Sequence, residues 1–379
     1  MKSIFSLLLL ILCVTAQAQE IIQGQPQAQQ KNVIELPQWV KDIKVSGYGM
    51  LQYQAEDKEN AKHNEFNLRL LRFIIDGKIG DFDWRAQIQA TSNAGPGNPT
   101  VMLVDLYTEW NKYKELRVKA GQFKRPFTFE NPTNPITQGW YSYGLAVTNL
   151  VGTGDRTGEK SSNGRDIGIQ LQGDLLPNVN GRRLLHYQVG VYNGEGINQK
   201  DRDNQKDFIG GLWVIPFEGF RIGTFGWTGT RGEMIVGQHA DATGTIVNDI
   251  ASVRKNRYAL SAEYDKNEYT FRTEYIHSQG WGSGKPNDNT VNYTLGDKAD
   301  GWYTFGIVPV IKQKLHAKAR YNVYRDNKQW NRMKTMYEIG ANYFFTPKLQ
   351  LNMEYARVND RTATKHNYNF FDIELDFRF

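Results

Sequence analysis

The last ten residues of the chain alternate strictly between apolar and charged side chains. Every odd position from Phe371 to Phe379 is apolar, and every even position from Asp372 to Arg378 is charged. Because successive side chains of a strand point to opposite faces, this segment predicts a strand between an apolar and a wet environment. An edge strand of a soluble sandwich also alternates. The dense charge and the terminal aromatic residue favour the closing strand of an outer-membrane barrel.

Similar short alternating segments, separated by Gly, Asn, Asp and Pro, recur along the rest of the chain. They predict an all-β fold, a transmembrane antiparallel β-barrel of about 16 strands. The predicted strands are 43–54, 65–79, 81–91, 101–111, 116–123, 166–173, 184–192, 208–216, 220–227, 256–264, 269–278, 301–308, 312–324, 335–345, 348–357 and 370–379.

The connections between these segments differ in length, and none of the chain shows a helical period. Tight turns are predicted at 79–81, 216–219 and 346–348, and long polar connections at 92–100, 126–165, 229–255, 279–300 and 358–369. Short periplasmic turns and long extracellular loops are typical of outer-membrane barrels. Within 68–75, Arg69 and Arg72 fall on opposite parities, and a bulge there would return both to the lumen.

The amino terminus predicts export. Lys2 precedes an apolar run at 5–14, and the small-x-small pattern at 16–18 predicts a signal peptide at 1–18. The run is shorter than the roughly 20 residues of a spanning helix. Cys13, the only cysteine, lies inside it, so we expect no disulfides in the mature chain. The Gln-rich segment 19–42 is predicted to be a periplasmic lead-in with little structure, and 43–379 to be the barrel.

Composition supports this localisation and excludes one class of partner. The chain has 20 Tyr, 19 Phe and 9 Trp, as expected for aromatic girdles at the two surfaces of a membrane. The formal net charge is only +6, without the basic cluster of a nucleic-acid-binding module. We therefore expect contact with outer-membrane lipid in a Gram-negative bacterium, and no nucleic acid.

The predicted strand at 312–324 carries the first candidate site. Its even positions are cationic or histidine, and period two would place them in one file along the lumen, where they would attract anions. The file consists of Lys312, Lys314, His316, Lys318 and Arg320. The alternative is a balanced polar lining, in which carboxylates of the following strands neutralise the file; these are Glu338, Glu354, Glu374 and Asp376.

The long connection 126–165 is the second candidate site. A loop of this length after the fifth strand could fold inward and narrow a pore, and arginine and lysine there could hold an oxyanion. The cations at this loop are Lys124, Arg125, Arg156, Lys160 and Arg165. The alternative is a surface loop with solvated charges. The Gly-rich stretch 152–160 lacks the spacing of a phosphate-binding loop, so nucleotide binding is not expected.

The residue pattern gives no indication of catalysis. The six histidines are scattered without metal-ligand spacing, and neither a nucleophile elbow nor a zinc-protease motif occurs. We therefore predict that the chain is no enzyme and needs no cofactor.

Several motifs occur in an order that resembles a known family. They are LRLLRFIIDGKI at 68–79, VDLY at 104–107, VKAGQFKRPF at 118–127 followed by Glu130, GRDIGI at 164–169, and GVYNG at 190–194. Together they resemble the phosphate-selective porin O and P family of outer-membrane porins. This resemblance implies a sixteen-stranded barrel, usually a homotrimer, whose third loop folds into the channel. It also implies that basic residues select small anions such as phosphate.

We therefore expect a passive diffusion channel selective for phosphate-like anions. The residues expected to line it are Lys124, Arg125, Arg156, Lys160, Arg165, Lys314, Lys318 and Arg320. One alternative is a general or sugar- or peptide-permeable porin, with Trp140, Tyr141 and Tyr143 at its constriction. Another is a barrel that binds ligands through its surface loops and transports nothing. The acidic face of the last strand argues against a uniformly cationic pore.

Overall fold

The computed structural model describes residues 42–91, 101–159, 164–283 and 289–379. The chain divides into two units, 1–41 and 42–379, and the described residues all belong to the second. The predicted signal peptide at 1–18, the lead-in up to residue 41 and the candidate cation Lys160 lie outside the described residues.

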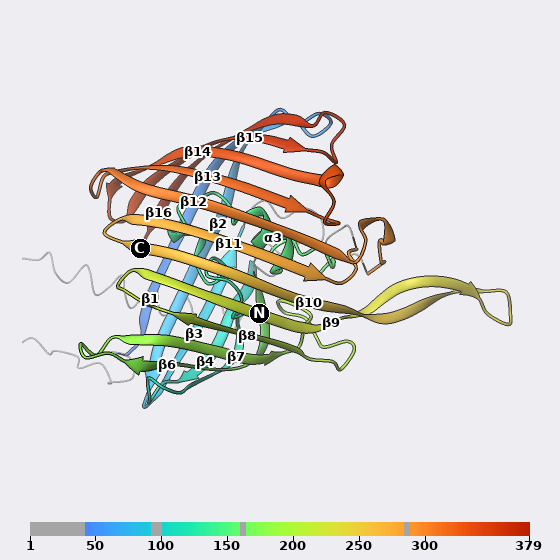
Figure 1. Ribbon diagram of the computed structural model, residues 1–379, viewed down its shortest axis with the longest axis horizontal. Helices are drawn as coiled ribbons and strands as arrows, with labels where there is room; N and C mark the ends of the chain where they lie inside the picture. The colour runs from blue at the N-terminus through green and yellow to red at the C-terminus, as the bar shows by residue number, and fades with distance from the viewer. Residues whose placement is uncertain (1–41, 92–100, 160–163, 284–288) are drawn as a thin grey trace, which may run out of the picture. The chain divides into compact units, whose positions relative to one another are not determined.

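Residues 42–379 form a closed barrel of antiparallel strands (Figure 1). Each strand pairs with its sequence neighbours, and β16 pairs with β1, so the backbone groups bond within the sheet as hydrocarbon surroundings require. The strands are β1 (Lys44–Glu56), β2 (His63–Ile79), β3 (Phe82–Ala90), β4 (Val101–Trp110), β5 (Arg117–Lys124), β6 (Arg165–Pro177), β7 (Arg183–Tyr192), β8 (Asp207–Val214), β9 (Phe220–Ala240), β10 (Ile246–Lys266), β11 (Tyr269–Gln279), β12 (Lys298–Ile311), β13 (Leu315–Arg325), β14 (Met333–Thr346), β15 (Leu349–Asp360) and β16 (Asn367–Arg378). The predicted barrel of about 16 strands is confirmed.

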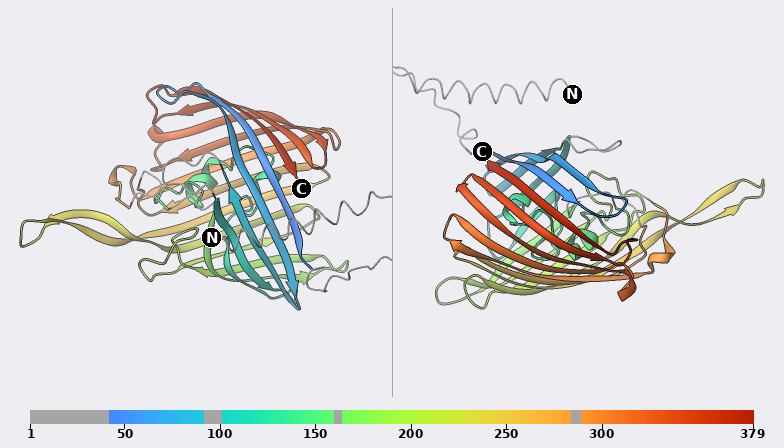
Figure 2. Two further views of the ribbon diagram at one scale, coloured as in Figure 1. Left: turned by 180° about the vertical axis from the view of Figure 1, so that it is seen from behind. Right: turned by 90° about the horizontal axis from the view of Figure 1, so that it is seen from above.

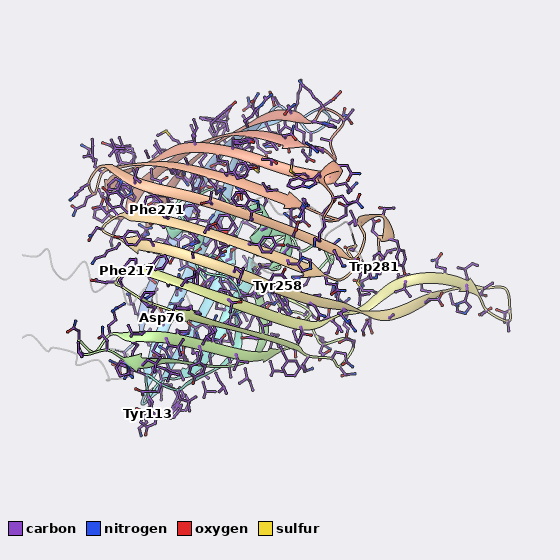
Figure 3. All side chains as sticks on the ribbon, in the orientation of Figure 1. Asp76, Tyr113, Phe217, Tyr258, Phe271 and Trp281 are labelled. Atoms are coloured by element: carbon purple, nitrogen blue, oxygen red, sulfur yellow. The ribbon has the colours of Figure 1, made fainter. Side chains whose placement is uncertain are left out.

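The alternation along each strand separates an outer apolar surface from an inner polar one. On β16, Phe371 is 37% exposed on the outer face, whereas Glu374 is fully buried on the inner face. Aromatic residues gather outside near both ends of the strands. In Figure 3, Tyr113, Phe217 and Phe271 lie toward the short turns, and Tyr258 lies nearer the long loops. This distribution matches two interfacial girdles around an apolar band.

The two ends of the barrel differ as predicted, with one correction. Short turns and the carboxyl terminus share one end, and the longer connections share the other (Figures 1 and 2). The predicted loop at 229–255 is wrong, because β9 and β10 continue through most of it as a ribbon that projects beyond the neighbouring strands. A ribbon in water needs no continuous apolar face, so its Gly- and Asn-containing sequence did not indicate strands.

The connection after β5 contains a short helix that the sequence pattern did not predict. The helix α3 (Leu145–Leu150) has six residues, too few to display a helical period. Short 3₁₀ turns also occur, such as η1 (Pro135–Thr137). Within the described parts of the chain, no helix has the length and apolarity needed to cross a bilayer.

A bulge in β2 brings two arginines to the lumen. Met50 pairs with Leu70 and Leu51 pairs with Leu68, which leaves Arg69 as the extra residue of β2. Arg69 therefore contacts Glu374 inside the barrel, although its parity differs from that of Arg72. The predicted bulge is confirmed. It adds a cation to the lumen and leaves Arg69 without a partner in the β1–β2 ladder.

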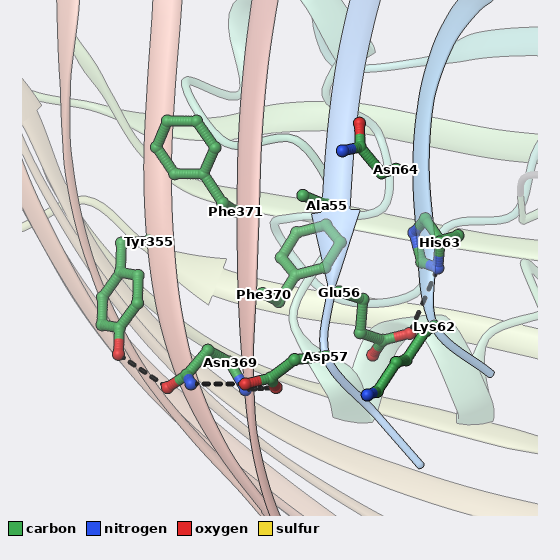
Figure 4. Close-up of a pocket in the computed structure, with 10 residues that line it drawn as sticks. All are labelled: Ala55, Glu56, Asp57, Lys62, His63, Asn64, Tyr355, Asn369, Phe370 and Phe371. Atoms are coloured by element: carbon green, nitrogen blue, oxygen red, sulfur yellow. Dashed lines mark hydrogen bonds and ion pairs between the residues drawn. The ribbon is translucent and has the colours of Figure 1, made fainter. Parts of the chain in front are cut away.

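The seam between β1 and β16 closes the barrel and is fastened at both ends. At the short-turn end, Gly47 and Phe379 exchange two backbone hydrogen bonds of 3.1 and 3.0 Å. At the other end, the Asp57 carboxylate accepts hydrogen bonds from the backbone and the side chain of Asn369 (Figure 4). The backbone hydrogen bond is the main reason that the pKa of Asp57 lies below its ordinary value of 3.8.

Replacing Gly47 by alanine should weaken this seam. A Cβ atom at Gly47 would lie 2.4 Å from the backbone oxygen of Arg72 and 2.3 Å from the Phe379 ring. We expect a loss of about 1–3 kcal/mol in the free energy of unfolding, because backbone must move to admit the methyl group. The measurement is urea unfolding in lipid vesicles. Gly226→Ala is the control, because nothing lies within 4 Å of that position, and equal stability of the two variants would contradict this account.

The Asp57–Asn369 contact should make the seam sensitive to acid. A carboxylate whose pKa is lowered by folding stabilises the fold above its unfolded value of 3.8, and this contribution disappears as the pH falls through the folded pKa. We therefore expect Asp57→Asn to lower the melting temperature at pH 7, with the difference from the parent shrinking as the pH falls below 3.8. Heat-dependent migration in detergent gels measures this, with Glu59→Gln, in the same loop, as control. A difference that persists in acid would refute the assignment.

Candidate pore constriction

The connection 125–164 between β5 and β6 folds into the barrel instead of covering it. Its residues Phe127, Phe129 and Trp140 are at most 2% exposed. They pack with inward-facing aromatics of β9 and β12, such as Phe225 and Phe305. The helix α3 contacts β11, β12 and β13, and the views in Figure 2 place it within the barrel. The loop therefore occupies the lumen beside β8–β13, which agrees with a constriction and not with a solvated surface loop.

Buried ion pairs fasten the loop to the wall at its two ends. Arg125, just after β5, donates to both oxygens of Glu159 at 3.1 and 2.7 Å and to Asp166 of β6 at 2.9 Å. The side chains of all three are fully buried. Arg257 of β10 likewise holds Asp155 through both carboxylate oxygens. Charges removed from water need such partners, so these cations serve the fold and face no solute.

The remaining predicted loop cations have partners of different kinds. Arg156 donates to the carbonyl oxygens of Gly280, Gly296 and Asp326, so it joins the loop to two extracellular connections. Arg165 of β6 pairs with Asp105, with nitrogen–oxygen distances of 2.6 and 3.1 Å.

The cationic file predicted on β13 is neutralised where it enters the lumen. Lys318 lies 2.7 Å from Glu354, and Arg320 contacts Glu338 at 2.8 and 2.6 Å. Both cations also lie over the ring of Trp140, 4.7 and 4.4 Å from its centroid. The balanced lining that the sequence left open as an alternative therefore describes this wall.

Lys314, by contrast, does not point into the lumen. The structure begins β13 at Leu315, so Lys314 lies in the preceding turn as an exposed residue. The predicted start at 312 is too early, because Gln313 adopts a positive φ of 59° that turns the chain.

The inner face of β16 is acidic, as expected. Asp372, Glu374 and Asp376 are at most 1% exposed. Gln52 of β1 donates to Asp372 at 2.7 Å and to Glu374 at 2.8 Å, and Arg69 contacts Glu374. The described residues nonetheless contain no group of three His, Cys, Asp or Glu side chains arranged to hold a metal. This wall thus carries carboxylates that lysine, arginine and glutamine partly compensate.

An open cavity of about 220 Å³ lies on the side of the lumen that the loop leaves free. Its walls come from inward positions of β3–β7 and from the loop prolines Pro126 and Pro132. The charged lining residues are Arg85, Lys119, Lys124, Arg125, Arg165 and a single carboxylate, Asp105. We call this cavity the corridor, because it is the space between the folded loop and the barrel wall.

The corridor cations are held in place by different means. Arg85 is paired with Asp76 at 2.7 Å, and Lys119 with Glu109 at 3.1 Å. Lys124 donates to Asn131 O, Thr133 O and Tyr143 Oη at 2.6, 2.7 and 2.7 Å, which are all uncharged oxygens. Its positive charge is therefore positioned without being cancelled by a bonded carboxylate.

A second cation without a carboxylate partner among the described residues lies beside the corridor. Arg72 of β2 donates to Tyr48 and Gln89, and no carboxylate of the described residues lies within ion-pairing distance of it. Arg72, Lys124 and Arg165 all lie within electrostatic reach of Asp105. Three cations therefore surround one carboxylate on this wall, and the acidic face of β16 lies two strands from β2 in the barrel order.

The structure thus brings three of the predicted site residues together, namely Lys124, Arg125 and Arg165. It places Arg156, Lys318 and Arg320 in contacts that hold the loop, and Lys314 outside the lumen. Sequence reasoning missed Arg85 and Lys119 as members of the lining. The alternation of β3 already put Arg85 on the polar face, but only the folded loop shows which polar faces remain open.

The rim pocket of Figure 4 is no part of this passage. Ala55, Tyr355 and Phe371 occupy outward positions of β1, β15 and β16, so the pocket opens on the outer surface.

Comparison with known proteins agrees with this architecture. Residues 46–208 match the family model described as phosphate-selective porin O and P. The chain is an outer-membrane β-barrel with the fold of a porin channel. No curated protein matches it.

Solved porin structures share the fold at low identity. The in-vitro folded OmpT of Vibrio cholerae is 15% identical, with a TM-score of 0.56 over 92% of this chain and 100% of that one. The outer membrane channel DcaP of Acinetobacter baumannii is 9% identical, with a TM-score of 0.57 over 89% and 97%. OprB of Pseudomonas putida is 10% identical, with a TM-score of 0.57 over 90% and 95%. Such identities establish the fold alone; the family match and the apolar outer surface assign the channel to the Gram-negative outer membrane.

Removing Arg125 should release the constriction loop. Arg125→Met would leave Glu159 and Asp166 buried without their shared partner, a change that typically costs about 3–5 kcal/mol. We expect a wider and more variable passage, measured as higher and noisier single-channel conductance in planar bilayers. Arg361→Met serves as control, because that arginine contacts only a carbonyl oxygen at the exposed rim. Unchanged conductance in a correctly folded Arg125→Met protein would mean that the loop is held by other contacts.

Proposed function

We propose that this channel is a passive diffusion porin that favours small anions, including phosphate. The observation that carries the proposal is the corridor, which is lined by Arg85, Lys119, Lys124 and Arg165 and by one carboxylate, Asp105; the fifth lining cation, Arg125, is fully buried in its ion pairs. Several of these cations have carboxylate partners outside the lining, but Lys124 and the neighbouring Arg72 do not. In a narrow passage with low-dielectric walls, such charge attracts anions and repels cations.

The assembly state belongs to the same proposal. We expect a homotrimer, as the family resemblance implies. A similar barrel, OmpT of Vibrio cholerae, has been solved in a trimer form at 13% identity and a TM-score of 0.55. The exposed apolar side chains around the barrel would face lipid or a neighbouring copy.

A general porin without anion preference is the second candidate. It is favoured by the acidic face of β16, which a solute would meet if it passed along that wall. The aromatic residues once expected at the constriction do not support it, because Trp140 is fully buried beneath Lys318 and Arg320.

Reversal potentials in a potassium chloride gradient distinguish the two candidates. We expect the purified protein in planar bilayers to show an anion preference, and Arg72→Gln and Lys119→Gln to reduce it several-fold. Lys119→Gln removes one positive charge from the corridor wall, and Arg72→Gln removes one from a buried position beside it. Lys112→Gln also removes one positive charge, but from an exposed turn where 50% of the Lys112 side chain is accessible to solvent. This variant should leave the selectivity unchanged. A cation preference of the parent protein would overturn the proposal, and absence of any conductance would favour a barrel that only binds.

A further inference from the structure

The corridor also presents uncharged hydrogen-bonding groups that no atom of the described residues satisfies. The hydroxyl of Tyr107 and the side-chain amides of Asn134 and Gln188 line it. None of these three side-chain groups has a hydrogen-bond partner among the described residues. An amide offers both donors and an acceptor, and a phenol offers one of each. These groups therefore remain available to whatever passes.

The neighbouring amides are already ordered by a chain of hydrogen bonds. Tyr192 donates to Gln170 at 2.9 Å, Gln170 donates to Gln172 at 2.8 Å, and Gln172 donates to Glu109. Glu109 in turn holds Lys119. The chain fixes the side chains of β6, so the amide surface of the corridor is positioned before a solute arrives. Positioned polar groups bind better than mobile ones because less conformational freedom is lost.

Apolar surface lies beside these polar groups. Tyr107 packs edge-on against Phe123, with ring centroids 5.9 Å apart. The ammonium group of Lys119 lies 4.7 Å from the centre of the Tyr107 ring and 5.5 Å from that of Phe123. Pro126 and Pro132 line the opposite side of the corridor. One wall thus combines a cation, aromatic carbon and neutral hydrogen-bonding groups within a short distance.

We infer that the preferred solute is a hydroxylated organic anion, of the class of sugar phosphates and sugar acids. This inference rests on the proposed anion preference and names the kind of anion. Its charged group would lie near Lys119 and Lys124, its hydroxyl groups would meet Asn134 and Gln188, and its carbon framework would pass Tyr107.

The chemistry of the two simpler solutes fits the lining less well. Bare phosphate presents mainly acceptor oxygens, so it would use the cations and the N–H and O–H donors of the lining but would leave the carbonyl oxygens of the free amides unused. A neutral sugar would use the amides and the aromatic surface but not the cations. Only a solute with both an anionic group and hydroxyl groups engages every part of the wall.

Solute block of chloride current tests the inference. Inorganic phosphate, glucose and glucose 6-phosphate are added in turn to single channels in planar bilayers at constant ionic strength. We expect glucose 6-phosphate to reduce the current at the lowest concentration. If phosphate blocks equally well, the inference fails while the proposed function stands. If the channel shows no anion preference in the salt gradient, the proposed function fails as well.

Two conservative substitutions separate hydrogen bonding from charge. Tyr107→Phe removes one hydroxyl, and Gln188→Leu removes one amide without changing the charge of the corridor. Each should weaken block by glucose 6-phosphate by about five-fold, the effect of one typical hydrogen bond, and should weaken block by phosphate less. Gln238→Leu, on the projecting ribbon, is the matched control. Equal loss of block by both anions, or no loss in either variant, would overturn the inference.

Discussion

A charge inside the lumen has to be compensated where water is excluded, and this constraint determines which residues can act on a solute. Arg125, Arg257, Lys318 and Arg320 meet carboxylates where the loop packs against the wall. The carboxylates neutralise these cations, because an unpaired buried ion costs several kcal/mol. The resulting ion pairs hold the loop in place. Lys124 instead donates to three uncharged oxygens, so no bonded carboxylate neutralises it beside the open space. Under the proposed function, the anion preference depends on the few cations that have no carboxylate partner.

The barrel could be predicted from the sequence, because each strand shows its own pattern of alternating apolar and polar residues. A strand with one face in lipid alternates strictly, as 370–379 does, and turn residues mark its ends. The ribbon of β9 and β10 was not predicted, because its outer half lies beyond the membrane, where a strand needs no apolar face. The helix α3 was not predicted, because six residues are too few to show a helical period.

The site could be predicted only in part, because it depends on ion pairs between residues that are far apart in the sequence. The sequence indicated that 126–165 would enter the lumen and that Lys124, Arg125 and Arg165 accompany it. It could not indicate that Glu159 and Asp166 would both turn to Arg125, since these contacts join positions 34 and 41 residues apart. Equally, the sequence left open whether Glu338 neutralises Arg320, and only the register of β13 and β14 places the two residues opposite each other. Which cations stay open is decided by pairing across the lumen.

The loop that is fastened inside the barrel also constrains how the protein folds. Arg257 of β10 and Glu354 of β15 both hold the same loop, which leaves the wall between β5 and β6. Strands that are far apart in the chain must therefore come together before the contacts of the loop can form. Such long-range contacts make assembly slow, because many loops must close before the contacts form. In the folded protein, the pairing of β16 with β1 encloses an interior that the loop has filled.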